Sequence, residues 1–149
     1  MSDGPAPIRT YRPVGAAVVS IVAGGSLLAV MTVIALALPP DVQEAFTFVQ
    51  DVTLAVVMGS ALAALYGIAR TRVRTDETGI HVINGFRRHD VSWTAALGVS
   101  LGRGAPWAVL DTNAGTTVQL MAIQRSDGDR ALRAVRELRA GIARYGESG

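Results

Sequence analysis

The chain has 149 residues, a formal net charge of +2 and a mean hydropathy of +0.34, enough for one small domain and two membrane-spanning segments. The absence of cysteine excludes disulfides, thiolate metal sites and cysteine nucleophiles, and two histidines are too few for the usual protein-only zinc site. All 14 basic residues are arginine. Residues 70–149 carry twelve of them against eight acidic residues, an excess too modest to indicate nucleic-acid binding.

The first 13 residues are polar and rich in proline. Pro5, Pro7 and Pro13 predict an extended arm without a regular element. Proline is well tolerated in a first helical turn, so the first helix is expected to begin at Pro13 or just after it. Residues 1–13 are therefore interpreted as a cytoplasmic N-terminal arm.

Two long apolar stretches follow and predict a transmembrane helical hairpin. One contains no charged residue over 25 positions and the other none over 18, whereas about 20 helical residues cross a hydrocarbon layer of ~30 Å. Pro39 and Pro40 end the first helix. The expected boundaries are 14–69 for the hairpin, about 14–38 and 46–69 for its spans, and 39–45 for the external loop.

Arginines flank the hairpin on both sides. Arg9 and Arg12 precede the first span, and Arg70, Arg72 and Arg74 follow the second. Because Lys and Arg are enriched in cytoplasmic loops near span ends, the chain is expected in the plasma membrane with both termini in the cytoplasm. A cleaved signal peptide is the competing interpretation, but the first apolar run exceeds the ~7–15 residues of an ordinary signal.

Two features of the spans bear on function. Asp51 could serve an ion path or pair with a partner subunit, but solvation at the outer headgroup level is the simpler interpretation, and a transporter would rest on this residue alone. Small residues four apart predict close helix packing, either between the spans or with another subunit. These residues are Ala16, Ser20 and Gly24 in the first span, and Ala55, Gly59, Ala63 and Gly67 in the second.

After residue 69 the pattern changes to about six short antiparallel strands separated by turns. Ile80 and Val82 alternate with polar residues, and Asn84-Gly85 predicts a type I′ hairpin turn. Apolar alternation is expected at Leu97, Val99 and Leu101, and again at Val118, Leu120 and Ala122.

A C-terminal amphipathic helix is expected after the strands. Ser126 or Asp127 can cap its start. A curved sheet closed by this helix satisfies the pattern, so the fold class is expected to be an α+β membrane protein, with a helical hairpin followed by an antiparallel β-barrel or sandwich over residues 70–149. The apolar stripe of the helix is expected at Leu132, Val135, Leu138 and Ile142.

Several short motifs follow one another in the C-terminal half: Arg74 to Gly79, Ile80-His81-Val82, Asn84-Gly85, Arg87-Arg88, Val91-Ser92-Trp93, Gly104-Ala105-Pro106-Trp107 and Thr117-Val118-Gln119-Leu120. Together with the two spans, they resemble the small actinobacterial membrane proteins that carry a bacterial pleckstrin-homology (PH-like) domain. The resemblance implies a cytoplasmic PH-like barrel without a catalytic centre. A full PH fold has seven strands, whereas six are apparent here.

The layout also resembles two-span accessory subunits of larger membrane assemblies, including the respiratory supercomplex of cytochrome bcc and cytochrome aa3 oxidase. This resemblance implies other membrane protein subunits as partners, and it rests on layout alone.

The sequence contains no nucleophile elbow, phosphate loop, metal triad or paired-carboxylate motif. His89 and Asp90 are adjacent, but neighbouring strand residues point to opposite faces and cannot form a dyad together. Trp93 and Trp107 could stack a ligand, although packing in or around a small core is the simpler interpretation. The chain is expected not to be an enzyme and to need neither a metal nor a cofactor.

Five arginines are candidates for contact with anionic lipid or a partner: Arg70, Arg72, Arg74, Arg87 and Arg88. Each arginine near an anionic membrane surface contributes ~1 kcal/mol of attraction. The alternatives are that the first three only orient the span and that the other two lie on a solvated strand face.

The leading hypothesis is a non-catalytic accessory or scaffold subunit of a larger membrane complex, docked through its hairpin and its PH-like domain. The alternative is a membrane-anchored PH-like module that binds anionic lipid headgroups or a signalling partner.

Overall fold

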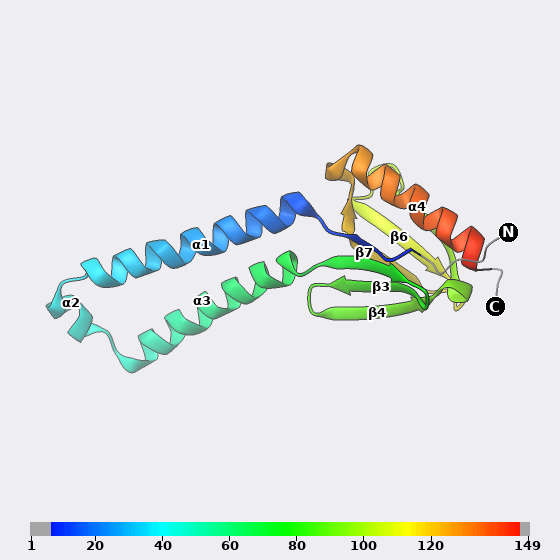
Figure 1. The fold of residues 1–149 in the computed structure, drawn as a ribbon. Helices are drawn as coiled ribbons and strands as arrows, with labels where there is room; N and C mark the ends of the chain where they lie inside the picture. The colour runs from blue at the N-terminus through cyan, green and yellow to red at the C-terminus, as the bar shows by residue number, and fades with distance from the viewer. Residues whose placement is uncertain (1–6, 147–149) are drawn as a thin grey trace.

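The computed structural model describes residues 7–146 and consists of a long hairpin of two apolar helices joined to an α+β domain (Figure 1). Two 3₁₀ turns, η1 (Trp93–Ala95) and η2 (Arg125–Asp127), complete the domain. The other elements, in chain order, are β1 (Arg9–Tyr11), α1 (Val14–Ala37), α2 (Pro40–Ala45), α3 (Phe48–Ala69), β2 (Arg72–Asp76), β3 (Gly79–Asn84), β4 (Arg87–Ser92), β5 (Ala96–Ser100), β6 (Trp107–Thr112), β7 (Thr117–Gln124) and α4 (Asp129–Tyr145).

The ends of the apolar helices follow from local sequence. Pro13 is the N-cap of α1, and the Pro39-Pro40 pair stops that helix and begins the separate short helix α2. Thr47 and Gln50 form a capping box at the start of α3, in which each side chain binds the other residue's backbone N–H. The predicted spans therefore agree with α1 and α3 to within two residues.

The hairpin exposes almost all of its apolar surface. Only 11% of the most apolar window of α1 and 6% of that of α3 is buried. Both helices, at 24 and 22 residues, are long and apolar enough to cross a membrane. A helix that is apolar on all sides and buried on few is suited to an apolar solvent, not to the core of a soluble domain.

The domain contains two antiparallel sheets, with strand orders β1-β2-β3-β4 and β5-β6-β7. Arg9–Tyr11 forms a strand that pairs with β2. The prediction of an N-terminal arm without regular structure is therefore wrong for these residues. The sequence does not reveal this three-residue strand, because it is surrounded by prolines and its pairing partner lies some 60 residues away, beyond the hairpin. With β1 included, the described residues form seven strands, one more than the sequence reveals.

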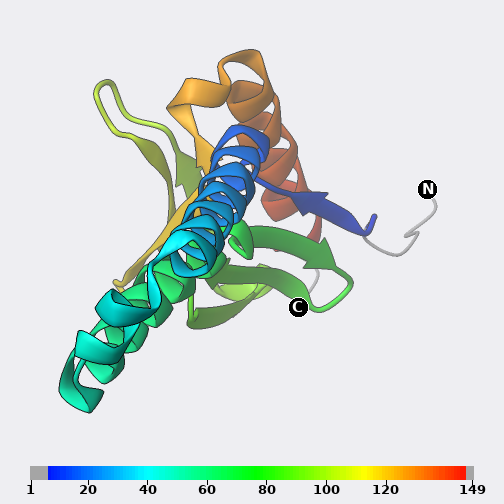
Figure 2. The ribbon, with the colours of Figure 1, turned by 90° about the vertical axis from the view of Figure 1, so that its left-hand side faces the viewer.

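The core lies between the two sheets and α4, as Figure 2 shows with α4 on one side of β1 and the strands β2 to β4 on the other. The expected row Val118, Leu120 and Ala122 is buried. The apolar stripe of α4 is placed differently from the prediction, because Leu132 is 47% exposed while Ala131 and Ala134 are buried. Small side chains face the sheets where the helix approaches closely.

Two further local predictions are wrong in part: of the row Leu97, Val99 and Leu101, only Leu97 lies outside the core, and the predicted hairpin turn is displaced by one residue. A β-bulge between Ala96 and Gly98 shifts the register of β5, so that Ala96 and Val99 are buried and Leu97 points outward. The hairpin turn after β3 is Gly85-Phe86 instead of Asn84-Gly85, since Asn84 pairs with Arg87. Gly85 alone has a positive φ, of 60°, as a type II′ turn requires at its first central position.

Candidate functional site at the membrane junction

The helical hairpin is inserted between two paired strands of the domain. β1 ends at Tyr11 and β2 begins at Arg72, and these strands pair in the register Tyr11 to Val73 and Arg9 to Thr75. Pro13, which connects β1 to α1, is fully buried. The chain therefore leaves the sheet at β1 and re-enters it at β2. Both ends of the hairpin are thus attached to the same sheet without a linker.

β1 is also attached to the C-terminal helix. The Arg9 guanidinium lies 2.6 Å from the Glu137 carboxylate, and the Tyr11 hydroxyl donates a hydrogen bond of 2.9 Å to the same carboxylate. The hydrogen bond from Arg9 holds the pKa of Glu137 below its ordinary value, and burial raises the pKa of Tyr11. The strand before the hairpin is thus joined to α4, more than a hundred residues later.

A second contact, here named the clasp, joins the end of α3 to the β3–β4 turn and consists of Tyr66, Gly67, Arg70, Thr71 and Phe86. The guanidinium of Arg70 lies 5.6 Å from the ring centroid of Tyr66 and 5.7 Å from that of Phe86. The hydroxyl of Thr71 donates to the carbonyl of Gly67 and accepts from the backbone N–H of the turn. The clasp fixes the turn against the helix end.

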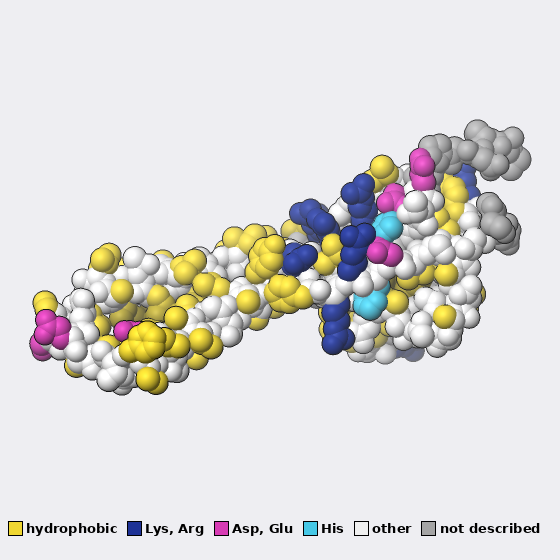
Figure 3. Space-filling view, turned by 90° about the horizontal axis from the view of Figure 1, so that it is seen from below, with side chains coloured by type: hydrophobic (Ala, Val, Ile, Leu, Met, Phe, Trp, Pro, Cys, Tyr) yellow, Lys and Arg dark blue, Asp and Glu magenta, His cyan; other side chains and the backbone are white. Residues whose placement is uncertain are grey.

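A basic face lies on the outer side of the four-stranded sheet and is defined by Arg72, Arg74 and Arg88 (Figure 3). Arg72 and Arg88 lie opposite the same residue of β3, Ile83, one from each neighbouring strand. Because cross-strand neighbours share a face, the three guanidinium groups gather beside the hairpin. Apart from the Arg88–Asp90 pair, their charges are not neutralised by ion pairs with described residues.

A hydrogen-bonded network borders the basic face. His81 lies between two carboxylates, with Nδ1 2.6 Å from Asp90 and Nε2 3.0 Å from Asp76. The hydrogen bond to Asp90 raises the pKa of His81 above its ordinary value of 6.5. The pKa values of both carboxyl groups are lowered, that of Asp76 chiefly by the Thr78 hydroxyl and that of Asp90 chiefly by His81. Asp90 therefore pairs across strands with His81, and His89 takes no part.

The structure places the five candidate arginines at three different locations. Arg72, Arg74 and Arg88 form the basic face, whereas Arg70 belongs to the clasp. Arg87 lines a different cavity together with Phe86 and His89. Adjacent residues of a strand point to opposite faces, so Arg87 and Arg88 do not act on one surface.

The small residues of the two spans also have different surroundings. Ser20 is buried, and a Cβ atom at Gly24 would lie 3.7 Å from Leu65 of α3, so the first set faces the other helix. Gly67 lies under Phe86 of the clasp. The remaining small residues are Ala16, which is half-buried, and Ala55, Gly59 and Ala63, which are exposed.

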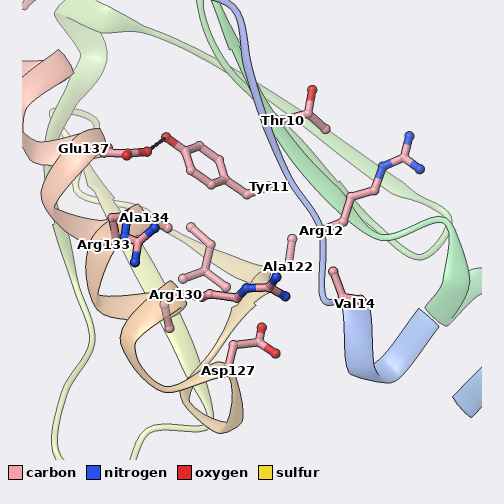
Figure 4. A pocket seen from close by; sticks show the side chains of 12 residues that line it. Thr10, Tyr11, Arg12, Val14, Ala122, Asp127, Arg130, Arg133, Ala134 and Glu137 are labelled. Carbon is pink, nitrogen blue, oxygen red and sulfur yellow. Dashed lines mark hydrogen bonds between the residues drawn. The ribbon is translucent and has the colours of Figure 1, made fainter. Parts of the chain in front are cut away.

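A cavity that the sequence did not reveal lies between β1, β7 and the first turns of α4 (Figure 4). Arg12, Arg130 and Arg133 line it, with Val14 of α1 at one edge. The three arginines come from segments separated by more than a hundred residues. Their gathering depends on the pairing of β1 with β2, which no local pattern indicates.

The described residues contain no group of three or more His, Asp or Glu side chains arranged to hold a metal. Trp93 is 7% exposed, donates its indole N–H to the carbonyl of Asp76 and packs on Tyr145 with ring centroids 5.5 Å apart. Trp93 therefore belongs to the core, while Trp107 lies half-exposed on the outer side of β6. Asp51 is exposed in the first turn of α3.

Comparison with known proteins finds one family and several relatives to which parts of the chain are similar. Over 94 residues the chain is 36% identical to uncharacterized proteins of Mycobacterium tuberculosis (strains H37Rv and CDC 1551) and Mycobacterium bovis. The matched stretch covers 60% of this chain and 61% of each relative, so the chain spans about three fifths of the curated relatives it matches. No solved structure matches significantly. Residues 70–140 match the family described as bacterial PH domain, so the domain that begins after α3 is similar to bacterial PH domains and gains β1 from outside the matched region.

Proposed function

We propose that this protein is a non-catalytic accessory subunit, anchored in the plasma membrane by its hairpin and docked on a larger membrane complex. The observation that carries the proposal is the insertion of the hairpin between β1 and β2. Two attachments to one sheet hold the domain in one orientation relative to the hairpin, which suits a subunit that presents a fixed surface to a partner.

Membrane insertion is supported by the exposed apolar surface of α1 and α3 and by the arginines at their domain ends. Because β1 and β2 pair with each other, the two helix ends nearest the domain must lie on the same side of any membrane. A hairpin of two spans meets this requirement. The positive-inside rule supports a cytoplasmic location for the domain and for the described ends of the chain.

Docking on partner spans is supported by the outward row of small residues on α3. Ala55, Gly59 and Ala63 are exposed, and a Cβ atom added at Gly59 would have no neighbour within 4 Å. Small residues let helix backbones approach closely in lipid. The specific partner proposed is the respiratory supercomplex of cytochrome bcc and cytochrome aa3 oxidase, which is supported by the two-span layout and by the mycobacterial relatives.

Purification of the tagged full-length chain in mild detergent, followed by quantitative mass spectrometry, tests this proposal. We expect cytochrome bcc and aa3 subunits to co-purify, and a variant with Gly59→Leu and Ala63→Leu to lose them. Val56→Leu, which enlarges a side chain already 61% exposed on the same helix, serves as the matched control. A monomer without any membrane partner would contradict the docking function, and a different complex would contradict only the specific partner.

The basic face supports a second candidate function, the binding of anionic lipid surfaces by the domain. Arg72, Arg74 and Arg88 present charge close to the hairpin, where each contributes ~1 kcal/mol of attraction to an anionic surface. Proteoliposomes carrying the full chain should capture anionic vesicles at low salt, and replacing the three arginines with alanine should abolish the capture. Arg103→Ala and Arg136→Ala are the controls. Equal capture of zwitterionic vesicles would count against this function.

A further inference from the structure

The cavity between β1, β7 and the N-terminal part of α4 has a volume of about 560 Å³. This volume falls within the range of ~300–1,000 Å³ typical of small-molecule sites. Ala122, Ile123, Ala131 and Ala134 supply apolar lining, while Arg12, Arg130 and Arg133 supply positive charge. An apolar floor under cationic groups suits an amphiphilic anion better than an inorganic ion.

Arg130 is the principal cationic group of this cavity. Figure 4 shows its side chain extending from α4 across the opening toward the junction of β1 with α1, while Arg12 extends away from it. Within the part of the chain that the structure describes, Arg130 forms no hydrogen bond or ion pair. A guanidinium is suited to phosphate because its planar N–H donors match two phosphate oxygens.

Two carboxylates also line the cavity, and they do not cancel its charge. Glu137 is engaged by Arg9 and by the Tyr11 hydroxyl. Asp127 lies on the wall below Arg130 without an ion pair to it (Figure 4). With Glu137 paired to Arg9, Arg130 and Arg133 are opposed by Asp127 alone, and the cavity keeps a positive charge.

The position of the cavity identifies the source of the anion. Val14 lines it and is also the first residue of α1. If α1 crosses the membrane, as the proposed function requires, its first residue lies where the hydrocarbon region meets the headgroups. Phospholipid phosphates are the concentrated anions at that depth, and the glycerol and upper acyl carbons lie beside them.

We propose that this cavity binds the phosphate and glycerol of an anionic membrane phospholipid, with Arg130 as the main phosphate contact and Arg133 as a supporting one. The bound lipid would fill the space between β1 and α4 and join both to the membrane surface. The inference depends on the membrane insertion of α1 but not on the docking of a partner complex.

Native mass spectrometry of the full-length chain, released from nanodiscs of equal phosphatidylglycerol and phosphatidylcholine content, tests the site. We expect retained phosphatidylglycerol, and a loss of affinity of about tenfold in Arg130→Gln, as for one charge-assisted hydrogen bond. Arg136→Gln, on an exposed position of the same helix, should retain the lipid. Asp127→Asn should bind it more tightly, because it removes a competing carboxylate without removing a phosphate contact.

The outcomes are distinguishable. Equal lipid retention by Arg130→Gln and Arg136→Gln, or no effect of Asp127→Asn, would overturn the site. Displacement of the lipid by millimolar inorganic phosphate or glycerol phosphate would reassign it to a soluble phosphate compound. Extraction of the chain from membranes by alkaline carbonate would instead contradict insertion itself, and with it the proposed function.

Discussion

The helical hairpin and the α+β domain place their apolar side chains in opposite ways. The hairpin directs Val, Ile and Leu outward and places small residues such as Ser20 and Gly24 between its helices, whereas the domain buries Ile80, Leu110 and Leu120 completely. The difference supports the proposed membrane insertion of the hairpin, because apolar side chains that point outward are stable in lipid, whereas a domain in water buries them. The paired strands β1 and β2 are where one arrangement changes into the other.

The sharpest separation of the two regions comes from equivalent leucine truncations. Leu120→Ala removes a side chain that is 0% exposed and should lower the free energy of unfolding by ~2–5 kcal/mol. Leu36→Ala removes one that is 82% exposed on the hairpin and should change it by less than about 0.5 kcal/mol. Denaturant unfolding of the domain in nanodiscs measures both values. Similar losses from the two variants would contradict the division of the molecule into two solvents.

The junction predicts a second contrast between two glycines of α3. A Cβ atom at Gly67 would approach the Phe86 ring to 3.0 Å, whereas one at Gly59 would meet nothing within 4 Å. Gly67→Ala should therefore cost ~1 kcal/mol and displace the β3–β4 turn, and Gly59→Ala should be neutral. Thermal unfolding and the NMR shifts of Phe86 provide the measurement. An unperturbed turn in Gly67→Ala would show that the clasp is not a tight contact.

The attachment of β1 to α4 predicts a similar but more local effect. Tyr11→Phe removes the hydrogen bond to Glu137 and should destabilise the domain by about 1 kcal/mol. Protection of the β1 amides against hydrogen exchange should fall by a comparable factor, while that of β6 should fall only with global stability. Equal protection of β1 in the variant and the parent would show that pairing with β2 alone holds the strand.

The smallest predicted effect is a pH dependence of the domain. The raised pKa of His81 means that the protonated imidazole contributes fully to the stability of the domain below pH ~6.5. This contribution is lost as the pH rises through the pKa of His81 in the folded state. The lowered pKa values of Asp76 and Asp90 mean that their carboxylates stabilise the domain above pH ~4, and this contribution is lost in acid. The network should therefore stabilise most between these limits.

Comparison of His81→Gln with His89→Gln isolates this contribution, because His89 lies outside the network. The stability difference between His81→Gln and the parent should be larger at pH 5.5 than at pH 8.5, measured by denaturant midpoints. His89→Gln should show no such dependence. Parallel pH profiles for both variants would rule out a role for the His81 network.

Features that depend on near neighbours follow directly from the order of the amino acids. The lengths of the apolar runs, Pro39-Pro40 and the Thr47–Gln50 spacing determine where α1 and α3 begin and end. The alternation of apolar and polar residues predicts which face of β7 is buried, because this pattern lies within the sequence of the strand itself. The flanking arginines give an orientation that membrane topology experiments can check.

Features that join distant segments depend instead on how the folded chain packs, and the tertiary structure is needed to see them. It made a strand of Arg9–Tyr11 by pairing it with β2, turned the β3–β4 hairpin at Gly85-Phe86 so that Asn84 could bind the backbone of β7, and shifted the buried side of α4 to Ala131 and Ala134. Each depends on a partner far away in sequence whose position is set by packing. The cavity around Arg130 arises in the same way, since its walls meet only when β1 pairs with β2, which follows the hairpin in the sequence.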